Sequence, residues 1–525
     1  MKRAFVLILL VVVVPSIQPA EPPVAALRID SSYATIWKEK GIVSTQRSSD
    51  EEFLRRISLD LTGRIPTLDQ SLVFLESKDP GKREKLIRQL LDSAEYGEYF
   101  AALWTNLILG HEKERFVDRE AFQDWFEERI ASDTGWDRIV SLLISAEGSF
   151  QDTPQLNWFA RQKLNPNNLA DDTARLFLGI QLGCARCHNH PHDQWKLEDF
   201  YGLAAFYSGM KPERFDPIEK MKARELKSQK ELEEFRRTLP LKQDSDPNVF
   251  AEVQGGRKTY PAKFLLTPQP AHLSGESKRK ALAKWVTAPD NPFFAKALVN
   301  RVWGMMMGKG FVEPVDDMGS LSDNSNPELL AFLTEDFKQH GYSLRLLLWA
   351  IANSKTYQLS SRGGTEGIYY QCGKVEMLNA DQTLNSFLVI TNVDEKLRSR
   401  NRGDYEEKRD LIYRHHVFLF DNDDNRGKET EFRGTISQAL FLLNGKMTNE
   451  AIRPLSDGAT SIVLRRYPDT ELRLDGLFLT AVSRRPFPAE KKVMLKYVEQ
   501  RGDAAAAYED ILWALLNSNE FLFNH

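Results

Sequence analysis

The sequence lacks an excess of either charge. It has 70 Lys and Arg residues against 74 Asp and Glu residues, a formal net charge of −4. Basic residues alternate with acidic ones rather than clustering, which excludes the basic surface typical of a nucleic-acid-binding protein. With 42% hydrophobic and 27% charged residues, the composition is that of a soluble globular protein. At 525 residues, the chain is long enough for two to four domains.

Long apolar runs are also lacking, except at the start of the chain. There the apolar run Ala4–Val14 follows the basic residues Lys2 and Arg3 and ends at Pro15. A membrane-spanning helix needs about 20 apolar residues, so this shorter run predicts a signal peptide over residues 1–26, with cleavage after Ala20 or Ala26. We therefore expect an exported protein in the periplasm or at the cell surface, without a transmembrane segment in the mature chain.

Motifs of the common hydrolases are absent. The sequence has no Gly-x-Ser-x-Gly nucleophile turn and no recognisable Ser-His-Asp pattern. Carboxylates are present, but 74 of them are too many for sequence alone to select a catalytic pair. No reaction follows from these observations, and whether the protein is an enzyme stays open.

Cysteine is scarce but concentrated. Two of the 3 cysteines and three of the 9 histidines lie within Leu182–Trp195. Cys184, Cys187 and His188 form the pattern Cys-x-x-Cys-His, which is the attachment pattern of a c-type haem. Two thiols about one turn apart can each add to a haem vinyl group, and the following histidine can then bind the iron. The motif predicts a cofactor but no substrate.

The same residues allow two other sites. In an oxidising compartment, Cys184 and Cys187 could form a short disulfide. They could also bind zinc or another metal with neighbouring imidazole and carboxylate groups, namely those of His188, His190, His192 and Asp193.

Two further residues, Met210 and Cys372, have predicted roles. Met210 is our first candidate for a sixth iron ligand, because its thioether follows the aromatic stretch that ends at Tyr207. His190 and His192 lie too close to His188 along the chain to reach the opposite face of a haem. Cys372 is left without an obvious partner, and we expect a buried small apolar residue there.

Helical spacing of apolar residues dominates the chain. We predict a mostly α fold with two helical domains, 27–209 and 273–525, joined by a connector with little β structure over 210–272. The connector combines a charged stretch, Lys220–Arg237, with a proline-rich irregular segment. Few apolar residues in the charged stretch predict a solvated helix. The connector's only strand-like run is Ala262–Leu266.

A weak internal repeat relates the two ends of the chain. Leu59–Pro66 resembles Leu479–Pro486, with a helix followed by an arginine and a proline turn. Leu346–Tyr357 parallels Asp510–Phe521, and Leu90–Tyr96 ends in the same way. This pattern predicts one helical unit used twice.

These residues together resemble a known family. Phe53–Thr67 and Cys184–Trp195 resemble the planctomycete cytochrome-associated domain of unknown function (family 1549). Asn291–Trp303, Ser354–Ser361 and Leu512–Phe523 resemble its usual C-terminal partner domain (family 1553). The resemblance covers nearly the whole mature chain. It implies an exported protein of a kind often found beside cytochrome c-like and carbohydrate-binding modules, and it supplies no established reaction.

The chain departs from that family in lacking a second Cys-x-x-Cys-His motif, and hence the separate cytochrome module of many relatives. Any redox partner is therefore expected in trans. Our leading hypothesis is an exported protein with one covalent haem, serving electron transfer or haem-assisted oxidation. The alternative is a non-redox binding or hydrolytic protein, associated with polysaccharide or the cell surface. Its cysteine-histidine stretch would then be a structural metal or disulfide site.

Overall fold

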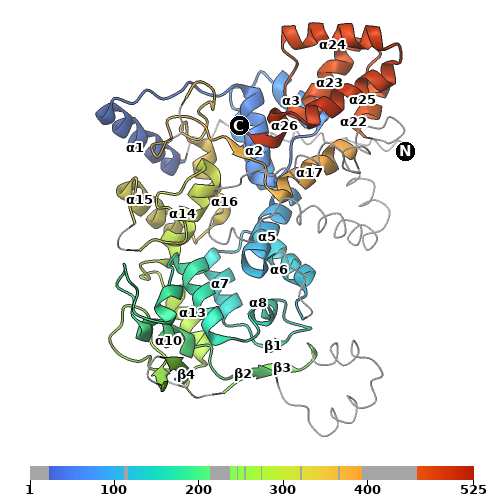
Figure 1. Cartoon of the computed structure of the whole chain (residues 1–525). Coiled ribbons are helices and arrows are strands. Elements are labelled where there is room, and N and C mark those ends of the chain that lie inside the picture. Colours follow the sequence, from blue (N-terminus) through green and yellow to red (C-terminus); the bar gives the residue numbers. More distant parts are fainter. Residues whose placement is uncertain are drawn as a thin grey trace, which may run out of the picture.

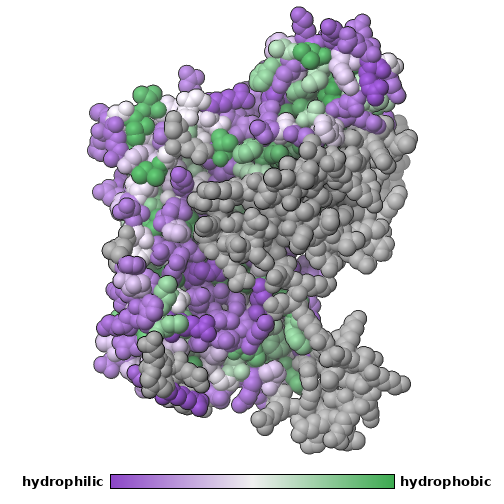
Figure 2. Space-filling view, in the orientation of Figure 1, coloured by the Kyte–Doolittle hydropathy of each residue, from purple (hydrophilic) through white to green (hydrophobic). Residues whose placement is uncertain are grey.

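The computed structural model describes residues 23–110, 116–212, 237–244, 246, 248–253, 256–273, 275–319, 322–364, 367–392 and 458–525. Helices dominate this part of the chain, and the predicted mostly α fold is confirmed (Figure 1). In Figure 2, the visible face is mainly hydrophilic, with apolar residues in small separate areas. Among the described helices, none is both long and apolar enough to cross a membrane.

The helices of the first half are α1 (Val24–Lys40), α2 (Asp50–Thr62), α3 (Leu68–Glu76), α4 (Lys82–Leu91), α5 (Ala94–Leu109), α6 (Arg119–Ala131), α7 (Trp136–Ile144), α8 (Leu156–Arg161), α9 (Pro166–Asp172), the π-helix η1 (Thr173–Leu178), the 3₁₀-helix η2 (Gly183–Arg186) and α10 (Leu197–Ala205). Those of the second half are α13 (Lys278–Val286), α14 (Phe294–Met307), α15 (Pro327–Gln339), α16 (Leu344–Asn353), α17 (Ala380–Thr391), α22 (Ala459–Arg466), α23 (Thr470–Val482), α24 (Pro488–Arg501), α25 (Ala504–Leu516) and α26 (Asn519–Leu522).

The strands form three small antiparallel sheets. The first has the order β1 (Gly148–Ser149), β3 (Pro240–Gln243), β2 (Met210–Pro212), with Met210 opposite Gln243. The second is the hairpin of β4 (Asn248–Val253) and β5 (Gly256–Pro261). The third pairs β6 (Glu376–Met377) with β7 (Phe523–Asn524).

The predicted connector therefore holds β2, β3, β4 and β5. The strand predicted at Ala262–Leu266 is wrong, because the chain turns there. Ala271 donates its backbone N–H to the carbonyl of Ala262 at 2.7 Å, and Leu266 has a left-handed φ of 62°. Of the predicted charged helix, residues 220–236 lie outside the described residues.

Apolar packing continues across the predicted domain boundaries. One core cluster extends from Ala25 to Tyr370 and takes in both α7 and α13, which pack against each other. A second cluster joins α23 and α25 to Leu59, Ile65 and Leu68 near the start of the chain. The C-terminal helices (red in Figure 1) accordingly lie beside α2 and α3. The boundaries at 209 and 273 stay predictions.

The predicted repeat is visible in α2–α5 and α23–α26. Both α2 and α23 end at a left-handed residue, Gly63 with φ 62° and Ser483 with φ 59°. An arginine and a proline follow each, before two further helices. Ser93 then caps α5 and Ser518 caps α26.

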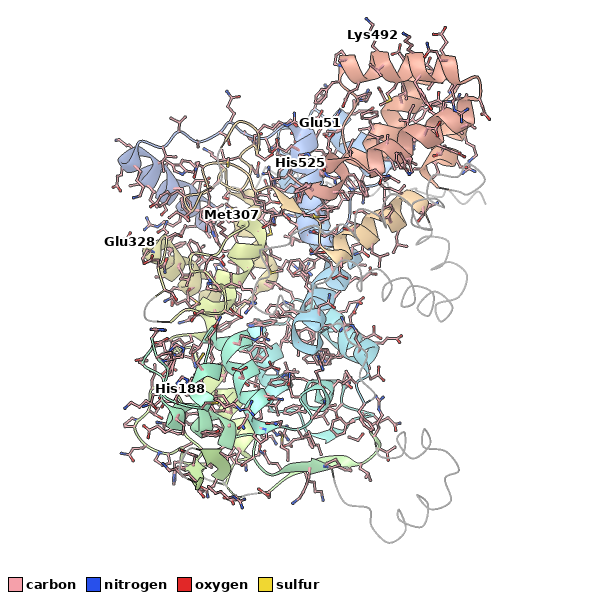
Figure 3. All side chains as sticks on the ribbon, viewed as in Figure 1. Glu51, His188, Met307, Glu328, Lys492 and His525 are labelled. Carbon is pink, nitrogen blue, oxygen red and sulfur yellow. The ribbon has the colours of Figure 1, made fainter. Side chains whose placement is uncertain are left out.

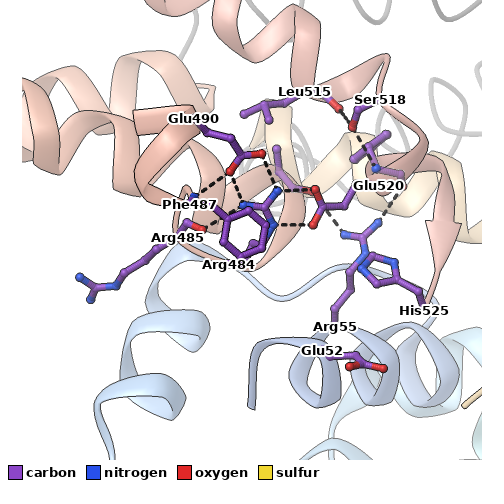
Figure 4. Close-up of polar contacts among 12 residues, drawn as sticks. Glu52, Arg55, Arg484, Arg485, Phe487, Glu490, Leu515, Ser518, Glu520 and His525 are labelled. Atoms are coloured by element: carbon purple, nitrogen blue, oxygen red, sulfur yellow. Dashed lines mark hydrogen bonds and ion pairs between the residues drawn. The ribbon is translucent and has the colours of Figure 1, made fainter. Parts of the chain in front are cut away.

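The arginine after each left-handed residue pairs with a glutamate in the last helix of its own unit. Arg64 lies 3.7 Å from Glu95, and Arg484 lies 2.5 Å from Glu520. These glutamates occupy equivalent positions, each in the first turn of the capped helix. Figure 4 shows the Arg484 pair, in which Glu490 also binds the guanidinium at 2.7 Å.

Two adjacent arginines of α2 are buried, each 1% exposed. Arg56 donates to a carboxylate oxygen of Glu52 at 2.6 Å and to the carbonyl of Tyr357 at 2.9 Å. Arg55 donates to the carbonyl of Phe521 at 2.7 Å, and Figure 4 shows its side chain next to His525. One helix thus supplies buried donors to two distant parts of the chain.

We expect Arg56→Met to destabilise the protein strongly, because it leaves the carboxylate of Glu52 buried without its ion-pair partner. Breaking a buried pair on one side costs roughly 3–5 kcal/mol. The shift should appear in the midpoint of urea unfolding. The matched control is Lys284→Met, which removes a pair whose lysine side chain is 74% exposed and should leave the midpoint nearly unchanged. Equal shifts in the two variants would contradict the assigned role of Arg56.

Candidate functional site

The cysteine motif lies on an exposed 3₁₀ turn. Cys184 belongs to η2 and Cys187 ends it, and both are free, exposed thiols in this structure. The two thiols are three residues apart along the chain, a spacing that places side chains on one side of a 3₁₀-helix. Ala185 between them is 0% exposed and anchors the turn in the core. His188 follows directly and is exposed; Figure 3 labels it in the lower half of the molecule.

Segments from both halves of the chain support the turn. The π-helix η1 leads into it and ends at Gly179, whose φ is 63°. The backbone N–H of Met318 donates to the carbonyl of Gly179 at 2.7 Å. A Cβ at Gly179 would lie only 3.1 Å from Ala297 and Met318 atoms, so a glycine is needed both for the conformation and for the close approach.

Tyr201 of α10 and Tyr260 of β5 support the turn. The hydroxyl of Tyr201 donates to the carbonyl of Arg186 at 3.1 Å, and its ring stacks on Tyr260 of β5 with centroids 5.0 Å apart. Burial raises the pKa of Tyr201, Arg186 opposes this shift and Cys187 adds to it, so the hydroxyl remains a donor at neutral pH. Tyr201 lies in the aromatic stretch that ends at Tyr207, but the sequence did not indicate its contact with Arg186, and Tyr260 was missed.

The histidines of the motif share one loop but do not meet at one point. The Nδ1 of His188 lies 2.7 Å from the carbonyl of Asn189. His190 donates its backbone N–H to the carbonyl of Trp195 at 2.8 Å, which closes the loop, and His192 donates its backbone N–H to Nδ1 of His190 at 3.3 Å. Among the described residues, no three His, Cys, Asp or Glu side chains converge to hold a metal ion. The zinc alternative therefore has no preformed ligand set there.

Two other predicted residues lie in different surroundings. Met210 is the first residue of β2, and its half-buried side chain packs against the first core cluster. Its role as a sixth iron ligand stays a prediction. Cys372 is buried at 7% exposure, as predicted for a small apolar residue.

Acidic side chains lie close to the cysteine-histidine motif. Asp316 is 0% exposed, and its carboxylate is 3.7 Å from Arg175. Burial raises the pKa of Asp317, with Asp316 and Asp193 adding to the shift and His190 opposing it. The loop that carries Asp316 and Asp317 thus faces the histidine loop. A Cβ at Gly319 would lie 2.4 Å from Oδ2 of Asp193, so the two loops are in close contact.

Two more acidic residues of this cluster, Asp171 and Asp172, lie nearer to η2. Burial raises the pKa of Asp171, and Asp172 raises it further, while Arg175 and Arg186 oppose the shift. Asp172 also has a raised pKa caused by burial, although Trp158 donates its indole N–H to it at 3.1 Å. These carboxylates are costly to ionise in the folded protein.

We expect Asp171→Asn to stabilise the protein at pH 7. A carboxyl whose folded-state pKa is raised destabilises the folded state above that pKa, and the amide removes this cost, on the order of 1 kcal/mol. The gain should shrink as pH falls through the raised pKa and vanish below the unfolded-state value of about 3.9, where wild-type Asp171 is protonated in both states.

Urea unfolding of wild type and variant at several pH values measures this difference. The control is Asp290→Asn, at an exposed aspartate, which should change little at any pH. A gain from Asp171→Asn that is absent at pH 7, or that does not depend on pH, would count against the assigned electrostatic cost.

Comparison with known protein families finds a match for two parts of the chain. Residues 28–212 match the model of PSCyt2, a protein of unknown function (DUF1549). Residues 278–498 match that of PSD1, a protein of unknown function (DUF1553). No curated protein and no solved structure matches the chain. The exposed cysteine motif lies in the first match, and the loop of Asp316 and Asp317 that faces it lies in the second. The chain therefore belongs to the proteins that combine a DUF1549 domain with a DUF1553 domain.

Proposed function

We propose that this protein is exported and carries one covalent c-type haem, bound by Cys184 and Cys187 with His188 as an axial iron ligand. The observation that carries the proposal is the exposed turn, in which two free thiols lie three residues apart and an exposed histidine follows. Vinyl addition needs thiols that a haem can reach. Buried or bridged cysteines would not meet that need.

The hydrogen bonding of His188 supports the same assignment. A carbonyl oxygen can only accept, so the contact of 2.7 Å with Asn189 makes Nδ1 the protonated nitrogen. In the neutral imidazole, Nε2 is then the nitrogen with the free lone pair, the one that would bind iron. Haem- and metal-ligating histidines commonly have their other ring N–H held by a backbone carbonyl in this way.

The function that follows is electron transfer with a partner supplied in trans. When bound, the haem would supply one-electron chemistry. Thiols and imidazole that are exposed on the protein surface leave an attached group within reach of another protein, which electron exchange requires. The chain itself holds one Cys-x-x-Cys-His motif, so the second redox centre must come from elsewhere.

We expect the haem to remain attached after denaturation and acid-acetone extraction when the protein is exported from a host with haem-attachment machinery. Cys184→Ser and Cys187→Ser should each weaken retention, and the double variant should abolish it, because the thioether bonds are lost. Cys372→Ala is the matched control, because it removes the buried third cysteine and should keep full retention. His188→Ala should leave haem attached but change the spin state of the iron in the absorption spectrum.

The contrary outcome is equally specific. Exported protein without haem absorbance, but with about one equivalent of zinc or a Cys184–Cys187 disulfide by mass, would reject the haem assignment. It would favour the alternative of a non-redox binding or hydrolytic protein with a structural clip at the motif.

Export is the second part of the proposal, since covalent haem attachment takes place outside the cytoplasm. Ala25 and Ala26 are 3% and 1% exposed, and Ala25 belongs to the first core cluster. Cleavage after Ala26 would remove both residues, so their burial supports cleavage after Ala20. N-terminal sequencing of the exported protein should therefore begin at Glu21. A chain that still begins with Met1 would contradict export by cleavage, and one that begins at Leu27 would contradict the packing argument.

A further inference from the structure

The backbone carbonyl of Arg186 lies between the two cysteines of the motif along the chain. Its peptide bond joins Arg186 to Cys187, so its orientation fixes where the second thiol and the following His188 lie relative to Cys184. Within the turn, η2 ends at Arg186, and Cys187 continues with φ −107° and ψ −31°. The last carbonyls of a short helix have no partner within the helix. Another group must hold this carbonyl if the turn is to have one conformation.

Tyr201 supplies that group from a neighbouring helix. Its hydroxyl donates to the carbonyl of Arg186 at 3.1 Å, across 15 residues of sequence. The side chain is 4% exposed and belongs to α10, which packs directly against η2. A phenol has few rotatable bonds, so a packed ring places its hydroxyl accurately.

The ring of Tyr201 is fixed in turn by the β4–β5 hairpin. Tyr260 stacks on it with centroids 5.0 Å apart and an interplanar angle of 19°. Both strands of the hairpin pack on α10. On the same helix, Asp199 binds Lys263 at 2.8 Å, just beyond β5. The hairpin therefore holds α10 and the Tyr201 ring together against the motif.

We propose that Tyr201 is a positioning residue that sets the relative orientation of Cys184, Cys187 and His188, and that Tyr260 acts through it. The inference deepens the proposed function and rests on it for its purpose, because the orientation matters for two thioether bonds to one haem. A misoriented Cys187 would leave the haem attached through Cys184 alone. The positioning itself is a property of the protein without haem.

The test uses Tyr201→Phe in the full chain, which removes the hydroxyl and keeps the stacked ring. Tyr370→Phe is a closely matched control. Tyr370 is also 4% exposed, and its hydroxyl donates to the backbone carbonyl of Lys309 at 2.9 Å, away from the motif. Loss of stability alone should affect both variants alike.

Two readouts are needed. In reduced, haem-free protein, the rate of alkylation of Cys187 by iodoacetamide relative to that of Cys184 should rise roughly threefold in Tyr201→Phe, about the factor expected for one lost hydrogen bond. Tyr370→Phe should keep the wild-type ratio. In haem-loaded protein, peptide mass should show a smaller share of haem bound through both cysteines in Tyr201→Phe only. Tyr260→Leu should shift both readouts in the same direction by a smaller factor.

These readouts separate the two proposals. If wild type attaches no haem but the alkylation ratio shifts in Tyr201→Phe alone, the haem function is wrong and the positioning role stands. If the ratio is unchanged in Tyr201→Phe, or changes equally in Tyr370→Phe, the positioning role is wrong whether or not haem binds.

Discussion

The buried charges of α2 are the constraint on which the rest of the structure depends. Taking an ion out of water costs several kcal/mol unless it is well paired, so Arg55, Arg56 and Asp60 each require partners inside the protein. Asp60 accepts from the hydroxyl of Tyr357 at 2.7 Å and from the amide of Asn524 at 2.7 Å. Its position therefore depends on two segments that are far away along the chain.

Apolar packing and these polar contacts have different roles. The second core cluster, in which Leu59 and Ile65 pack against the C-terminal helices, supplies a driving force that depends little on direction. Hydrogen bonds depend strongly on direction. The donors of Arg55 and the acceptors of Asp60 consequently select one docking of the C-terminal unit on α2 among the many that would bury similar area. Lys374, 3.1 Å from Asp60, adds the compensating charge.

The sequence predicted α2 well but not its surroundings. The helical spacing of apolar residues predicted helices in this part of the chain, and α2 spans Asp50–Thr62. Periodicity could not show that the polar face is buried too, since that depends on partners contributed by distant segments. The β4–β5 hairpin was missed for a related reason. In Asn248–Val253, apolar and polar residues do not alternate regularly, so this segment has no clear strand signal.

For the candidate site, the sequence selected the residues and the structure shows which contacts support them. Cys184, Cys187 and His188 are adjacent, so a local motif was sufficient to select them. Tyr260, Met318 and Gly319 contact the motif region or its base from elsewhere, and their local sequence does not indicate these contacts. Their contacts are set by tertiary packing, which single-sequence patterns do not contain.

The contacts that support the motif come from both domains of the family. The exposed motif lies in the DUF1549 match, but the loop of Asp316, Asp317 and Met318 that backs it lies in the DUF1553 match. An exposed turn that must hold reactive groups in one geometry needs a rigid base, because loops are otherwise the most mobile parts of a fold. Here the base is completed by the second domain through the Met318–Gly179 hydrogen bond and the close contact of Gly319 with Asp193. A DUF1549 domain isolated from its partner would lose this base, which gives a physical reason for the two domains to occur in one chain.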